Sequence, residues 1–83
     1  MEMTFVEAYL KSSDWKRKIV LVSVFHKSRL SKDHRWTVRA TAKYFKISVG
    51  LASENLRLSL EWDKINTCHS RNEALKVLKN GHA

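Results

Sequence analysis

Residues 41–56, TAKYFKISVGLASENL, decide the fold of this chain, because two segments with helical apolar spacing meet there. The junction between them, residues 46–48, contains neither proline nor glycine. Periodicity alone would allow one uninterrupted helix over residues 38–60. However, Ile47 lies off the apolar stripe of such a helix, and Ser48 favours a helix cap over a helix interior. The stretch is therefore predicted to be a corner between two helices.

The spacing around this corner is typical of a helix-turn-helix. Ala42 is small where the second helix must approach the first, and Phe45 and Ile47 flank the turn. Ala52 and Leu56 are predicted to face inward from the second helix. In a unit of this kind the second helix lies in the major groove of DNA.

The flanking segments predict further helices. Residues 3–11 form a short helix with Phe5, Ala8 and Tyr9 turned inward, and Asp14 suits the N-cap of the next helix. Over residues 15–30 the apolar spacing favours a helix. The β-branched residues between 19 and 24 would also suit a strand, and this alternative stays open.

The rest of the chain completes an all-α prediction. Residues 31–35 form a basic loop, Thr37 caps a helix over 38–45, Ser48 caps one that reaches about Leu60, and residues 61–69 are a connection. Ser70 and Glu73 have capping-box spacing, with Glu73 reaching back to the cap amide, and Gly81 is placed to end the last helix near Asn80. We predict one domain over 1–83, a small helical bundle with a helix-turn-helix at about 37–60.

The charge is strongly asymmetric. The formal net charge is +8, and the stretch from Trp15 to Lys46 holds ten basic residues and one acidic residue. The remaining residues hold six basic and seven acidic residues, so the whole excess lies in the central stretch. Such asymmetry favours a polyanionic partner, of which nucleic acid is the commonest, over a merely well-solvated surface.

Candidate DNA contacts follow from the predicted corner. Residues on the first turns and outer face of the second helix are predicted to read base edges, and cations on and before the first helix to bind phosphates. Gly50 would allow a close backbone approach, and Glu54 would accept from a cytosine amino group or pair with Arg57. The base-reading set is Ser48, Val49, Gly50, Ser53, Glu54 and Arg57, and the phosphate-binding set is Arg39, Lys43, Lys46 and Arg35.

The segment WTVRATAKYFKISVGLASENLRLS (36–59) resembles the helix-turn-helix of ParB-like partition proteins and their phage- and plasmid-borne relatives. The resemblance covers about half the chain and implies specific duplex binding through the second helix. Two departures are Lys46 in place of the usual turn glycine and Ala52 in place of a larger apolar residue. The family's nucleotide-binding and dimerisation regions are not visible, so CTP binding and an ATPase partner are not predicted. The matching residues are Trp36, Thr41, Ala42, Ser48, Gly50, Ser53, Glu54 and Leu56.

Other functions are disfavoured. The four histidines and Cys68 lack zinc-site spacing, and the adjacent Cys68 and His69 do not build a catalytic pair, so we expect no metal, no cofactor and no enzymatic activity. One cysteine excludes an internal disulfide, and the longest apolar run is about a third of the roughly 20 residues that span a bilayer. Without a signal peptide or membrane contact, a cytoplasmic location in a bacterial or infected host cell is expected.

The sequence thus predicts a sequence-specific double-stranded DNA-binding protein, either a small transcriptional regulator or a partition or replication accessory factor of phage or plasmid type. Since one reading helix contacts few base pairs, a homodimer or several copies on repeated sites is expected. The alternative is a small phage-type protein that uses the helical scaffold to bind a host transcription or replication protein, with a packaging subunit that recognises DNA ends lying between the two.

Overall fold

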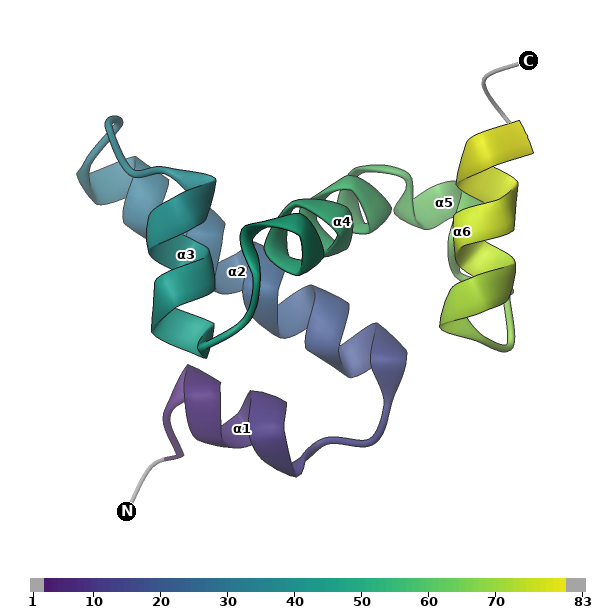
Figure 1. Cartoon of the computed structure of the whole chain (residues 1–83), viewed down its shortest axis with the longest axis horizontal. Coiled ribbons are helices and arrows are strands. Elements are labelled where there is room, and N and C mark those ends of the chain that lie inside the picture. The colour runs from purple at the N-terminus through teal and green to yellow at the C-terminus, as the bar shows by residue number, and fades with distance from the viewer. Residues whose placement is uncertain (1–2, 81–83) are drawn as a thin grey trace.

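The computed structural model describes residues 3–80, and its regular elements within that range are all α-helices (Figure 1). This confirms the all-α prediction, and the strand alternative for residues 15–30 is wrong. A short connection joins each helix to the next. The helices are α1 (Phe5–Lys11), α2 (Trp15–Lys32), α3 (Val38–Phe45), α4 (Val49–Leu60), α5 (Trp62–Ile65) and α6 (Arg71–Asn80).

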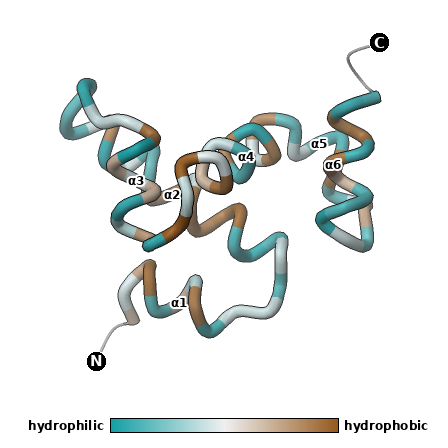
Figure 2. The backbone as a smooth tube through the Cα atoms, viewed as in Figure 1, coloured by the Kyte–Doolittle hydropathy of each residue, from teal (hydrophilic) through white to brown (hydrophobic). Residues whose placement is uncertain are grey.

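The longest helix, α2, packs against α1, α3 and α4. The Asp14 side chain caps it as predicted, accepting a hydrogen bond from the Lys16 amide at 3.0 Å. Ile19, Val22 and Phe25 follow helical spacing and are buried, so two of the four β-branched residues lie on the packed face of a helix. In Figure 2 the hydrophobic part of α2 lies where this helix passes beside α4. The helix continues to Lys32, two residues into the predicted basic loop.

The predicted corner is present between α3 and α4. Lys46 adopts the left-handed conformation, with φ 59° and ψ 42°. Its amide donates to the Lys43 carbonyl at 3.2 Å, and the Ile47 amide donates to the Ala42 carbonyl at 3.0 Å. This pair of bonds is the Schellman ending of a helix, usually built on glycine. A lysine therefore makes the turn that stops α3, and the single-helix alternative is excluded.

Capping residues begin both helices of the corner. The Thr37 hydroxyl accepts from the Ala40 amide at 3.1 Å, and the Ser48 hydroxyl accepts from the Leu51 amide at 3.0 Å. Both caps confirm the sequence prediction. Each satisfies one of the amides that the first turn of a helix leaves without an intrahelical partner.

One set of buried residues, here called the aromatic cluster, lies behind the corner. It contains Tyr9, Val22, Phe25 and Phe45, and Phe5, Trp36, Tyr44 and Ile47 pack against it. The Phe25 ring stacks on Tyr44 with centroids 4.0 Å apart and meets Phe45 edge-on at 5.2 Å. As predicted, Ala42 and Ala52 are buried, whereas Leu56 is only half-buried. Of the inward residues predicted for α1, Tyr9 is buried and Phe5 and Ala8 are half-buried.

A second set, the aliphatic cluster, joins α2 and α4 to the C-terminal helices. Its buried residues are Ile19, Leu58, Ile65, Cys68, Ala74 and Leu78. The sequence prediction missed α5, since residues 61–69 lack periodicity. This single turn forms because Ile65 is drawn into the cluster, and the Asn66 amide closes it on the Trp62 carbonyl at 2.9 Å.

The start of α6 partly follows the predicted capping box. The Glu73 amide donates to the Ser70 hydroxyl at 3.1 Å as expected. The reciprocal bond is different, because the Glu73 carboxylate accepts from the His69 amide at 3.0 Å and not from the Ser70 amide. Gly81, predicted to end α6, lies outside the described residues.

Candidate nucleic-acid interface

The outer face of α4 carries the predicted base-reading residues. Val49 is 42% exposed, Gly50 and Arg57 are exposed, and Ser53 is half-buried. Ser48 is exposed too, but its hydroxyl already accepts the capping bond from Leu51, so its oxygen holds the start of the helix.

The same face of α4 forms one wall of a groove, and α6 forms the other wall. Gly50, Ser53, Glu54 and Arg57 line the α4 side, and the groove has a volume of about 470 Å³. Leu75, Leu78 and Lys79 line the opposite side. The structure therefore brings four of the six predicted base-reading residues together, and it places α6 beside them.

Gly50 has room for a side chain within the protein. A Cβ atom built there would meet only the Ser48 hydroxyl oxygen, at 4.0 Å, and the backbone does not require a positive φ. Packing within the described chain therefore does not require glycine at position 50, and the close backbone approach to DNA that Gly50 would allow stays a prediction.

The predicted phosphate-binding residues are all exposed. Arg39, Lys43 and Lys46 are spaced i, i+4 and i+7, so they lie along one side of α3 and its turn. The opposite side of α3 carries the buried residues Thr41 and Phe45. Arg35 precedes this helix in the loop, where its amide donates to the Asp33 carboxylate at 3.0 Å.

Other cations of the central stretch have partners inside the molecule. The Lys16 ammonium donates to the Asn66 carbonyl at 2.6 Å, and the Lys18 ammonium lies 4.9 Å from the centre of the Tyr9 ring. The Arg29 guanidinium lies over the rings of Phe25 and Trp36, at 5.1 and 5.6 Å. The contacts of Lys18 and Arg29 are cation–π interactions. Part of the basic excess thus supports the fold, which the charge count could not reveal.

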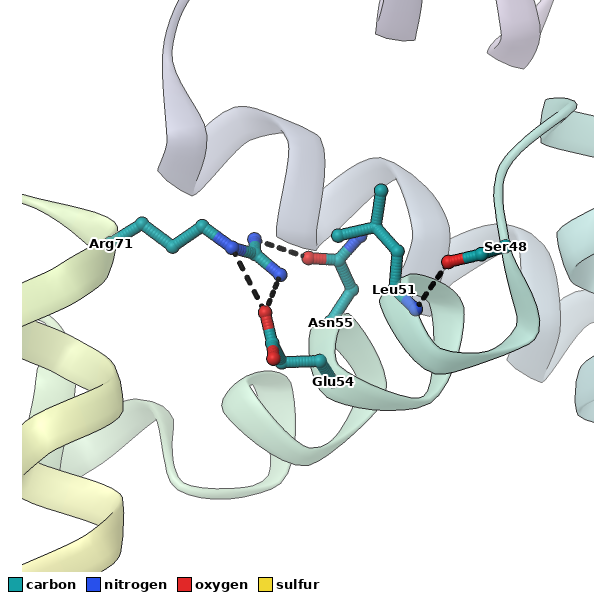
Figure 3. Close-up of polar contacts among 5 residues, drawn as sticks. All are labelled: Ser48, Leu51, Glu54, Asn55 and Arg71. Carbon is teal, nitrogen blue, oxygen red and sulfur yellow. Dashed lines mark hydrogen bonds and ion pairs between the residues drawn. The ribbon is translucent and has the colours of Figure 1, made fainter.

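The predicted pairing of Glu54 with Arg57 is wrong (Figure 3). Glu54 Oε1 accepts hydrogen bonds from Arg71 Nε at 3.2 Å and Arg71 Nη2 at 2.6 Å. Arg71 is the first residue of α6, 17 positions along the chain. It reaches Glu54 because the aliphatic cluster packs α6 against α4. Arg57 has no carboxylate partner among residues 3–80.

Arg71 also contacts the buried side of α4. Its Nη1 donates to Asn55 Oδ1 at 2.5 Å, and Asn55 is fully buried. The Nδ2 group of Asn55 has no hydrogen-bond partner in the described structure. Arg71 is not among the residues predicted to contact DNA. No local pattern marks it, because its role depends on the packing of two distant helices.

A second polar network fixes the N-terminal half of α3. The Trp36 indole donates to Thr41 Oγ1 at 2.7 Å, and Thr41 Oγ1 lies 2.7 Å from His26 Nδ1. Since an indole can only donate, the Thr41 hydroxyl hydrogen is free to donate to a neutral His26 ring. Desolvation by burial lowers the pKa of His26, which favours this neutral form.

Residues 3–80 also bear on two other kinds of site, a membrane span and a metal site. No described helix is long and apolar enough to cross a bilayer. Within the same range, no group of three His, Cys, Asp or Glu side chains is arranged to hold a metal ion.

Comparison of the chain with protein-family models, curated protein sequences and solved structures gives no match. The resemblance to the ParB-like helix-turn-helix therefore stays a prediction.

Proposed function

We propose that this protein binds double-stranded DNA in a sequence-specific manner, with α4 entering the major groove. One observation carries the proposal: the corner at Lys46 presents the exposed start of α4 next to the cations of α3. Arg39, Lys43 and Lys46 would contact phosphates, while the outer face of α4 would reach base edges. Such a protein would serve as a small transcriptional regulator, or as a partition or replication accessory factor.

The salt dependence of duplex binding tests the phosphate contacts. Each neutralised phosphate contributes about −0.9 to the slope of log K against log salt concentration. A triple variant, Arg39→Gln, Lys43→Gln and Lys46→Gln, should bind more weakly, with a slope shallower by roughly 3. The matched control removes three exposed charges from other helices, by Lys11→Gln, Arg17→Gln and Lys76→Gln. An equal loss in both variants would indicate that net charge, and not the corner, attracts the DNA.

Selection of bound duplexes from a random pool tests specificity and yields the site. A specific binder should enrich a defined sequence and hold it far more tightly than random DNA at physiological salt. Equally weak binding of selected and random duplexes would overturn the proposal.

A second candidate function is binding of a partner protein, such as a host transcription or replication protein or another copy of the chain. It is favoured by exposed apolar side chains: Val20 and Val24 are 44% and 49% exposed on α2, and Leu60 is 76% exposed at the end of α4. Leu30, Leu56 and Leu60 also line a groove of about 300 Å³. Complex formation through these residues would depend weakly on salt, which separates it from DNA binding.

A further inference from the structure

The position of Glu54 on α4 poses a physical problem for the proposed function, on which this inference rests. A carboxylate on a helix that enters the major groove is repelled by the phosphates on both sides. Here Arg71 compensates the charge of Glu54, and two of the three hydrogen bonds that its guanidinium donates go to Glu54 Oε1. The side chains remain 25% and 41% exposed for Arg71 and Glu54 respectively. The pair can therefore lie close to DNA without a net negative charge.

The second oxygen of Glu54 is available. Among the described residues no donor contacts Oε2, and in Figure 3 this oxygen lies on the side away from the guanidinium. A carboxylate oxygen only accepts hydrogen bonds, so phosphate oxygens cannot pair with it. Its partner in the major groove must be an exocyclic amino group of a base.

The chemistry of the base edges distinguishes the two amino groups. Adenine presents its N6 amino group next to N7, an acceptor that would repel a carboxylate. Cytosine presents its N4 amino group without a neighbouring acceptor on the same base. A fixed carboxylate therefore favours cytosine over adenine.

The carboxylate is fixed because Arg71 is fixed. Its Nη1 group is bonded to Asn55, the fully buried residue that follows Glu54 on α4. The guanidinium thus bridges a buried amide and an exposed carboxylate on the same helix. Ordering a side chain before binding removes part of the entropy loss that binding would otherwise require.

We infer that Arg71 is a positioning residue for base recognition, holding Glu54 so that Oε2 accepts a hydrogen bond from the N4 amino group of a cytosine in the bound duplex. The selected DNA site then contains one position at which cytosine is preferred through Glu54. Arg71 influences that position from α6, through Glu54.

The test compares base preferences of variants by selection from a random duplex pool. Glu54→Gln should change the preference at one position from cytosine to adenine, because a glutamine amide pairs with adenine N6 and N7, with a change of about tenfold. Arg71→Lys keeps the charge but loses the planar fork. It should weaken discrimination at that same position while the affinity for random duplex and its salt slope stay unchanged. Lys76→Gln, an exposed change on the same helix, is the control and should leave every position unchanged.

A charge swap separates positioning from a merely structural ion pair. Glu54→Arg combined with Arg71→Glu should restore helicity and the unfolding midpoint if the pair forms in reverse, but the preferred base should become guanine, which arginine reads through O6 and N7. Restoration of the original cytosine preference by the swap would overturn the inference. The inference would also be overturned if the wild type binds a specific site but its base preferences do not change in Glu54→Gln and Arg71→Lys. In that case the proposed function would still stand. If the wild type binds no duplex, both fail together.

Discussion

The aromatic cluster and the aliphatic cluster both include residues of α2 and stabilise their helices by different means. Behind the corner, the ring of Phe45 contacts those of Tyr9 and Phe25, so large rings from three helices meet there. Under α6 the buried residues are aliphatic or small, such as Ala74, and the Arg71 side chain adds polar bonds to α4. The corner should therefore be the more rigid region, and α6 should be the easier one to release.

The largest expected effect comes from removing the central ring of the aromatic cluster. Phe45 is fully buried, and Phe45→Ala should lower the free energy of unfolding by about 3–5 kcal/mol, because it leaves a cavity between α1, α2 and α3. Urea denaturation followed by circular dichroism measures this loss. Leu60→Ala, at a 76% exposed position, is the control and should change stability by no more than about 0.5 kcal/mol. Similar losses in both variants would contradict the assigned core.

The matching change in the aliphatic cluster is Leu78→Ala. Leu78 is buried near the described end of α6, so the loss should be smaller, about 2–3 kcal/mol. Amide hydrogen exchange should also show protection falling in α5 and α6 while it is retained in α2 to α4. Loss of protection throughout the chain would indicate that the two clusters open as one unit.

The turn at Lys46 gives a smaller effect of opposite sign. A non-glycine residue in the left-handed region costs about 1–2 kcal/mol, whereas glycine adopts it freely. Lys46→Gly should therefore unfold at a higher urea concentration than Lys46→Ala, by about 1 kcal/mol in free energy. Comparing these two variants cancels the loss of charge. An alanine variant as stable as the glycine variant would show that the turn is not strained in solution.

The smallest expected effect is a pH dependence of stability that arises from His26, which contacts Thr41 of α3. Burial lowers the pKa of His26 below its ordinary value of 6.5, so the unfolded chain binds its proton more tightly than the folded one. The resulting stability is present above pH 6.5 and is lost as the pH falls below it. Thermal unfolding between pH 7.5 and 5 measures the slope. His26→Gln should flatten it, whereas His34→Gln, at an exposed loop position, should leave it unchanged.

Local features of the fold could be predicted from the sequence. Thr37 and Ser48 cap their helices through amides three residues away, so the determining interactions lie within one turn. The corner could be predicted for the same reason, and the resemblance already put Lys46 where a turn glycine is usual, although the spacing alone does not indicate its left-handed conformation. Nothing in the lysine side chain favours the left-handed region, and packing of the buried Phe45 and the half-buried Ile47 on either side must supply the stabilisation.

Features that depend on packing between distant segments could not be predicted. Helical spacing makes residues three apart neighbours, so the sequence offers Arg57 as one of two alternative partners for Glu54, the other being a cytosine amino group. The true partner, Arg71, is brought there by the aliphatic cluster, which no short-range pattern describes. The sequence also does not predict α5, because a four-residue helix is too short to show periodicity.

The burial of Cys68 has a practical consequence. This is the only cysteine of the chain, it is 4% exposed, and it lies in the aliphatic cluster. A thiol reagent can reach its sulfur only when that cluster opens, so the rate of modification reports how often α5 and α6 separate from the rest. The unmodified protein thus contains a native probe for the local opening of one region. A duplex that engages Glu54 and holds α6 in place would lower the rate of Cys68 modification, so binding could be followed without an added label.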